Sequence, residues 1–195
     1  MTILTLDGLK KIVPLAGHRA ELAYQPLIDT MIAFGIDTVA RQAAFIAQVA
    51  HESGSFRYTA EIASGMAYNE REDLGNTKPE AIRIAALYGS LPGKWWKGHG
   101  WIQVTGFNNH KLCGKALGLD LLNKPSLLEI PIYAAKSAGW FWIENDLNKW
   151  ADAGDIDGVS DVVNRGHKTA RIGDALGYAE RAAFFERGLI YCQEA

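Results

Sequence analysis

Residues 44–56 read AFIAQVAHESGSF, and this stretch decides the fold that we expect. It completes a pattern in which small or aliphatic side chains recur at i, i+4, i+7, i+8 and i+11, which places them in one stripe along an α-helix. The stripe consists of Val39, Ala43, Ile46, Ala47 and Ala50. Asp37 or Thr38 is the expected N-cap, and Gly54 is expected just after the C-cap. Because most of the stripe is alanine, we expect another helix to pack closely against this one.

This helix ends on Glu52, where the negative end of the helix dipole disfavours the ionised form of a carboxyl group. Apolar neighbours such as Phe45 and Phe56 would add desolvation, so that Glu52 could hold a proton as a general acid must. Glu61 follows nine residues later, after a Ser-Gly-Ser turn. Glycoside hydrolysis uses two carboxyl groups, one protonated and one ionised, that flank the scissile bond. Two glutamates at this spacing also occur by chance, so the spacing alone leaves a structural interpretation open.

The second informative stretch is WWKGHGWIQVTGFNNH, residues 95–110. Within it, an extended conformation of residues 101–105 would place Trp101, Gln103 and Thr105 on one face. Neutral hydrogen-bonding groups beside an aromatic ring suit a sugar, which has apolar C–H faces and a hydroxylated rim. The alternative is a structural turn with a buried tryptophan.

The tryptophans fall into two classes. Those in loop-like sequence are candidates for the wall of a cleft, and they are Trp95, Trp96 and Trp101. Trp140 and Trp142 belong to a predicted helix and are expected in the core.

The rest of the chain is expected to be mostly helical. Apolar spacing and turn residues predict further helices over 7–16, 19–34, 79–88, 108–117, 131–145, 156–163 and 174–188. We therefore expect a mainly α, single domain over residues 1–195, in which a helical shell surrounds a loop-lined cleft with little or no β structure.

Composition and short motifs argue against several other classes of protein. A hydrophobic content of 48%, a charged content of 22% and a net charge of -2 are those of a soluble domain, so we expect no nucleic-acid partner. We find no signal peptide and no apolar run long enough for a membrane span, so we expect cytoplasmic synthesis and no stable membrane insertion. Cys113 and Cys192 fit neither a metal site nor a disulfide framework, and we expect reduced thiols. His51-Glu52 begins like the zinc motif HExxH, but residue 55 is serine, so we expect no metal and no cofactor.

Four motifs in one order resemble glycoside hydrolase family 19, most closely its bacterial and phage branch, which includes peptidoglycan-degrading endolysins. The motifs are AFIAQVAHESGSF, AEIASGMAYNEREDLGNT, KGHGWIQVTGFNNH and VVNRG. The resemblance covers roughly residues 30–190 and implies a lysozyme-like fold and an inverting, single-displacement mechanism. In this resemblance Glu52 matches the general acid, Glu61 the general base, and Thr105 the hydroxyl residue that helps to hold the attacking water. The positions that match residues lining the sugar subsites or shaping the cleft are Tyr68, Gln103, Asn109, Asn164 and Arg181. His99 and Trp101 complete the candidate set for substrate binding.

The chain also departs from the family pattern. His99 stands where most relatives have arginine between two glycines. Residues 78–97 form an insertion for which we expect a helical flap over the cleft.

The leading hypothesis from the sequence is a phage-type endolysin that hydrolyses the β-1,4 bonds of peptidoglycan glycan strands. We expect it to act as a monomer on the cell wall, after holin-dependent release from the host cytoplasm. A chitinase that acts on N-acetylglucosamine polymers is the first alternative, because both polymers share this sugar and the same bond geometry. The second alternative is a catalytically impaired glycan-binding protein, which the histidine at position 99 keeps open.

Overall fold

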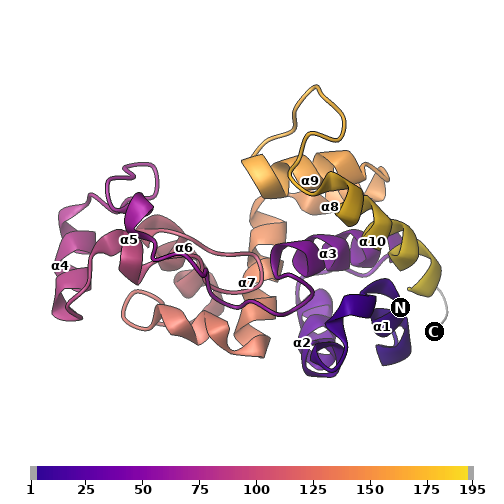
Figure 1. Cartoon of the computed structure of the whole chain (residues 1–195), viewed down its shortest axis with the longest axis horizontal. Coiled ribbons are helices and arrows are strands. Elements are labelled where there is room, and N and C mark those ends of the chain that lie inside the picture. Colours follow the sequence, from indigo (N-terminus) through magenta and orange to yellow (C-terminus); the bar gives the residue numbers. More distant parts are fainter. Residues whose placement is uncertain (1–3, 193–195) are drawn as a thin grey trace.

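The computed structural model describes residues 4–192, and the regular elements in this range are helices (Figure 1). The α-helices that coincide with predicted ones are α1 (Leu6–Ile12), α2 (Arg19–Ala33), α3 (Val39–Glu52), α4 (Pro79–Leu87), α6 (Phe107–Leu117), α7 (Pro131–Glu144), α9 (Ile156–Arg165) and α10 (Tyr178–Tyr191). The sequence does not predict the short helices α5 (Pro92–Trp95) and α8 (Leu147–Asp152), or the 3₁₀ turns η1 (Pro14–Ala16), η2 (Met66–Tyr68) and η3 (Pro125–Glu129). The prediction of a mainly α fold is confirmed. No helix in the described range is long and apolar enough to cross a membrane.

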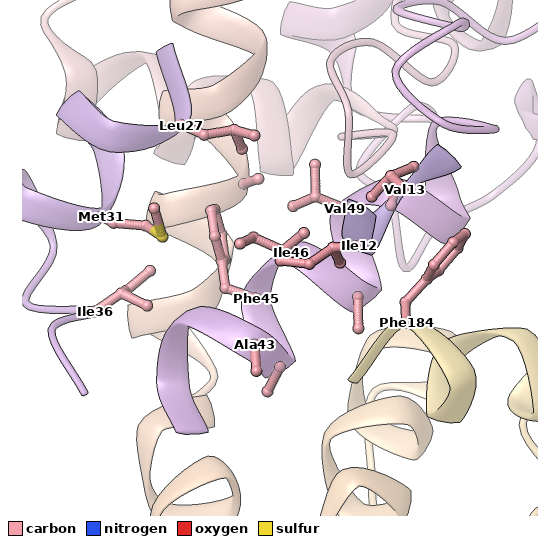
Figure 2. Close-up of a cluster of buried hydrophobic side chains, with 14 of the residues drawn as sticks. Ile12, Val13, Leu27, Met31, Ile36, Ala43, Phe45, Ile46, Val49 and Phe184 are labelled. Atoms are coloured by element: carbon pink, nitrogen blue, oxygen red, sulfur yellow. The ribbon is translucent and has the colours of Figure 1, made fainter. Parts of the chain in front are cut away.

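Helix α3 forms the centre of the main hydrophobic core. Its N-cap is Thr38, whose side chain accepts a hydrogen bond from the backbone N–H of Arg41 at 3.2 Å. Every residue from Gln42 to Ala50 is buried. Figure 2 shows Ile46 among side chains from α1, α2 and α10. The cap follows the prediction, whereas burial extends beyond the predicted stripe to all faces of the helix over these residues.

Helix α10 packs along α3 at a glycine. A Cβ atom added to Gly188 would lie only 2.6 Å from the Cβ atom of Ala43. Larger side chains at this crossing would push the two helices apart, because protein interiors are close-packed. The close helix packing that the alanines predict is thus present, and α10 is the partner.

The helices α4, α5 and α6 form a second group, to which α7 connects the α3 group (Figure 1). In its small core, Ile84 packs with Trp96 and Phe107. The prediction of a helix in the 78–97 insertion is confirmed. Helix α4 packs on this second core, at the end of the molecule away from α3 (Figure 1), and its role as a flap over the cleft stays a prediction.

Residues 101–105 do not adopt the extended conformation that their alternation predicts. The backbone N–H of His99 donates to the Val104 carbonyl oxygen at 3.0 Å, and the Val104 N–H donates to the His99 carbonyl oxygen at 2.8 Å. These two bonds close a turn, in which Gln103 has a left-handed φ of 55°. The described residues contain only isolated β-bridges and no strand, which confirms the expected scarcity of β structure.

The loop tryptophans are mostly core residues. Trp96 is fully buried and Trp101 is 2% exposed, so their prediction as cleft-wall residues is wrong. Trp95 is half-buried and stacks on Tyr88, with ring centroids 4.3 Å apart. An aromatic ring in irregular sequence can still contribute to a core when the segment folds back on a helix. Trp142 is buried as predicted.

Candidate active site

Glu52 is the last residue of α3, and its carboxyl group contacts Arg181 of α10. The same guanidinium group contacts the Gln48 amide oxygen and donates to the Leu176 carbonyl oxygen at 3.0 Å. The Arg181 side chain is 1% exposed and the Glu52 side chain 23%, so the cation is inside the protein while the carboxyl group reaches the surface. A charge-assisted hydrogen bond of this kind fixes the orientation of a carboxyl group. The expected apolar surroundings of Glu52 are thus incomplete, because the structure adds a buried cation.

Two further polar residues support this contact. Gln48 lies one turn before Glu52, is fully buried, and donates to the Ser160 hydroxyl oxygen at 3.2 Å. The Asn164 side-chain oxygen accepts a hydrogen bond from the Leu176 backbone N–H at 3.1 Å. Asn164 and Glu52 therefore belong to one network. The sequence analysis missed Gln48, because it lies opposite the predicted stripe of α3 and its burial appears only in the structure.

Glu61 lies in the irregular segment after α3, and neutral donors hold its carboxyl group. The Tyr68 hydroxyl donates to one carboxyl oxygen at 3.0 Å, and the Gly98 backbone N–H donates to the other at 3.1 Å. Burial, and then the hydrogen bond to Glu61, raises the pKa of Tyr68, which keeps this hydroxyl group protonated as a donor. The backbone is also fixed, because the Glu61 N–H donates to the Gly98 carbonyl oxygen at 2.8 Å and the Lys97 ammonium to the Glu61 carbonyl oxygen at 2.7 Å.

The turn that follows Glu52 has a left-handed backbone at three consecutive residues. The φ angles are 58° at Gly54, 60° at Ser55 and 62° at Phe56. The last two are non-glycine residues, for which this conformation costs about 1–3 kcal/mol each. The buried Ser53 hydroxyl compensates, since it donates to the Val49 carbonyl oxygen at 2.6 Å and accepts the Phe56 N–H at 2.8 Å. The turn thus directs the chain away from α3 at a fixed angle.

A cavity of about 330 Å³ lies beside the Gly98 segment. Three predicted residues line it, namely Gln103, Thr105 and Asn109, together with Ile102, Val104, Leu112, Trp140, Phe141, Glu144 and Asn145. A Cβ atom added to Gly98 would lie 2.6 Å from the Gln103 amide oxygen, so the cavity adjoins the segment that holds Glu61. The sequence analysis missed Glu144 and Asn145, and it assigned Trp140 to the core; Trp140 is 8% exposed and belongs to both.

His99 and Trp101 do not face a cleft. They are 4% and 2% exposed, respectively. Trp101 packs on Phe56 with ring centroids 5.4 Å apart, and the His99 imidazole lies against His110. Their prediction as substrate-binding residues is therefore corrected, because glycines on both sides of His99 let the segment turn its side chains inward.

The structure provides two partly exposed carboxyl groups, each in a fixed orientation. The segment that holds Glu61 adjoins a cavity whose wall combines apolar side chains with amide and hydroxyl groups. These are the groups that acid–base catalysis on a hydroxylated ligand requires. Within residues 4–192, no cluster of three or more His, Cys, Asp or Glu side chains could hold a metal ion. Cys113 and Cys192 are buried and unpaired, as predicted.

Similar solved structures show that this fold is known. Chitinase C from Streptomyces griseus HUT6037 superposes with a TM-score of 0.74 at 22% sequence identity, over 98% of this chain and 77% of that chain. A bacterial family 19 chitinase gives a TM-score of 0.68 at 20% identity, over 97% and 95% of the two chains. Similarity at these identities shows the fold alone, and it confirms the lysozyme-like helical domain.

Similar sequences are named after chitinases. An endochitinase of Arabidopsis thaliana is 35% identical over 135 residues, which are 68% of this chain and 43% of the relative. An inactive chitinase-like protein of Hevea brasiliensis is 31% identical over 179 residues, which are 80% of this chain and 55% of the relative. The chain thus spans about half the length of these relatives.

The family model described as chitinase class I matches residues 25–182, a range that contains both carboxyl groups, the turn between them and the cavity-lining residues. The chain belongs to this family, glycoside hydrolase family 19.

Proposed function

We propose that this protein is a glycoside hydrolase that cleaves β-1,4 bonds between N-acetylglucosamine units of chitin-type polymers. The observation that carries the proposal is the pair of partly exposed carboxyl groups, Glu52 and Glu61. Arg181 holds the first, and the neutral donors Tyr68 and Gly98 hold the second. The family and the names of its members support chitin as the substrate over peptidoglycan, which was the leading hypothesis from the sequence.

In the proposed mechanism the two carboxyl groups act at the same time. Glu52 gives its proton to the glycosidic oxygen as the bond to the anomeric carbon breaks. Glu61 takes a proton from the water that attacks this carbon from the opposite face, so the configuration inverts. Thr105 donates its hydroxyl hydrogen to the Gln103 carbonyl oxygen at 2.8 Å, which leaves its lone pairs for a hydrogen atom of the water.

The other candidate residues have binding or positioning roles in this proposal. Gln103 and Asn109 offer amide groups to sugar hydroxyls from the cavity wall. Tyr68 orients Glu61, whereas Arg181, with Asn164 behind it, orients Glu52.

The test measures hydrolysis of soluble chitin oligomers by the wild type and by Glu52→Gln and Glu61→Gln. We expect kcat to fall by about 10²–10⁴-fold in each variant, which is the usual contribution of a general acid or base. Glu186→Gln, which changes an exposed carboxyl group on α10, is the matched control. Early NMR spectra of the products should show the α anomer. Full activity of Glu52→Gln, or a β product, would overturn the assignment.

Peptidoglycan is the second candidate substrate, because the order of the four motifs resembles the bacterial and phage branch. In this case the protein would act as an endolysin, on the cell wall and after release from the cytoplasm. Digestion of purified sacculi, with mass spectrometry of the new reducing ends, compares the two polymers directly. Binding to either polymer without new reducing ends would instead support a catalytically impaired glycan-binding protein, a possibility that the relative named inactive also raises.

A further inference from the structure

Two buried histidines, His99 and His110, form a hydrogen-bonded pair behind the segment that holds Glu61. The His110 side chain is fully buried, and its Nδ1 lies 2.9 Å from the Gly106 carbonyl oxygen. A carbonyl oxygen only accepts, so Nδ1 of His110 carries the hydrogen atom and its Nε2 is an acceptor. His99 Nδ1 lies 3.2 Å from this Nε2 and must therefore be the donor. The hydrogen bonds thus fix both tautomers.

The charges around this pair favour neutral rings. Burial lowers the pKa of His99 to about 4, with a contribution from the nearby Lys97. Burial also lowers the pKa of His110 to about 3, with a contribution from His99. Glu129 is the facing carboxylate, with one oxygen 3.7 Å from the His99 Nε2. In weakly acidic to neutral solution, both rings are therefore neutral and the donor–acceptor order stays the same.

Within the segment Gly98-His99-Gly100, the one side chain is the imidazole of His99, which anchors the segment to His110. The backbone of this segment is bonded on both sides. The His99 backbone pairs with Val104, and the Gly100 N–H donates to the Thr59 carbonyl oxygen at 2.8 Å. Since glycine has no side chain, Gly98 is held only by its backbone bonds to Glu61 and by its neighbours in the chain, of which His99 is anchored to His110.

Gly98 in turn orients Glu61, together with Tyr68. Its N–H donates to a Glu61 carboxyl oxygen at 3.1 Å, and its carbonyl oxygen accepts the Glu61 N–H at 2.8 Å. We propose that His99 and His110 are positioning residues for Glu61, which hold the Gly98 amide where it orients the carboxyl group. The inference rests on the proposed role of Glu61 as general base.

The test compares His110→Phe, which keeps a ring but removes the acceptor, with His110→Gln, which retains an amide oxygen for His99. For His110→Phe we expect kcat to fall about tenfold or more with little change in KM. A misplaced catalytic group slows the chemical step, whereas it affects substrate binding little. We expect the acid limb of the pH–rate profile to move up by about one pH unit, since a carboxylate that loses a donated hydrogen bond is harder to ionise. His110→Gln should recover most of both effects. His18→Gln, at an exposed histidine, is the control.

A direct measurement separates this inference from the proposed function. Carbon-13 NMR follows the titration of the Glu61 carboxyl group without any turnover. Its midpoint should rise in His110→Phe and return towards the wild-type value in His110→Gln, even if the wild type hydrolyses neither polymer. A folded His110→Phe protein with an unchanged Glu61 titration would overturn the positioning role. A purely structural role would lower the melting temperature without moving this titration.

Discussion

The buried histidine pair should make the protein lose stability in mild acid. The pKa of His99 falls to about 4 and that of His110 to about 3, whereas both have the ordinary value of 6.5 in the unfolded chain. Below about pH 6.5 the unfolded chain therefore binds protons that the folded protein excludes. Stability conferred by the neutral pair is complete above this pH, and it is lost progressively as the pH falls towards 4 and 3.

The size of the effect follows from the protonation equilibrium of the unfolded chain. At about pH 5 an unfolded histidine is protonated in a ratio of about 30 to 1, while the folded ring stays neutral. This ratio corresponds to about 2 kcal/mol for each histidine, hence about 4 kcal/mol for the pair. The result changes little if the folded pKa values lie somewhat lower, because folded protonation is already minor at this pH. Since natural domains have a stability of about 5–15 kcal/mol, the loss is a large fraction.

Urea denaturation of the wild type and of His110→Gln, from about pH 8 to about pH 5, measures this loss. All other titrating groups are common to both proteins, so the difference between the two curves isolates residue 110. We expect the variant to lose about 2 kcal/mol less than the wild type over this range. His18→Gln, which replaces an exposed histidine that contacts Glu21, controls for the loss of a surface histidine, and it should differ from the wild type by less than His110→Gln does. Parallel curves for His110→Gln and the wild type, with equal denaturant slopes, would refute the reasoning.

Two further substitutions test the helices around Glu52. Lys168→Met removes the ammonium group that contacts Asp157 and lies within 3.8 Å of Asp155 and Asp161. Repulsion among the three carboxylates should then loosen the loop after α9, which limited proteolysis would show as faster cleavage. Gly188→Ala places a methyl group 2.6 Å from the Ala43 Cβ atom, and we expect it to lower the free energy of unfolding by about 1–3 kcal/mol in urea, which is the usual cost of overpacking.

The helices and the end of α3 could be predicted because their signals are local. Thr38 caps the N-terminus of α3, and Gly54, which has a left-handed backbone, follows its C-terminus. Between them the apolar stripe has the period of an α-helix. The position of Glu52 at a helix end therefore needed no knowledge of distant parts of the chain.

The family resemblance names Arg181 and Tyr68 as site positions, but their contacts with Glu52 and Glu61 could not be predicted from local patterns. Arg181 lies 129 residues after Glu52, and no local pattern connects them. In the turn after His99, a local pattern is present but predicts the wrong conformation. Its alternating side chains favour an extended strand, but burial of Trp101 and the paired bonds to Val104 impose a turn. Tertiary contacts outweigh an alternation of side chains that extends over only five residues.

The packing of α10 on α3 decides how Glu52 is held. Ala43 of α3 lies against Gly188 of α10, and nearer the end of α3 the side chains of Gln48 and Glu52 meet Arg181. The contacts run in opposite order along the two helices, so the helices are antiparallel. Gly188 and Arg181 are about 10 Å apart along α10, at 1.5 Å per residue. The small residues at one end thus bring the helix axes close enough for the buried guanidinium group of Arg181 to reach the partly exposed carboxyl group of Glu52 at the other end. The alanine stripe has a consequence beyond the core: bulkier residues there would move Arg181 away from the carboxyl group that it orients.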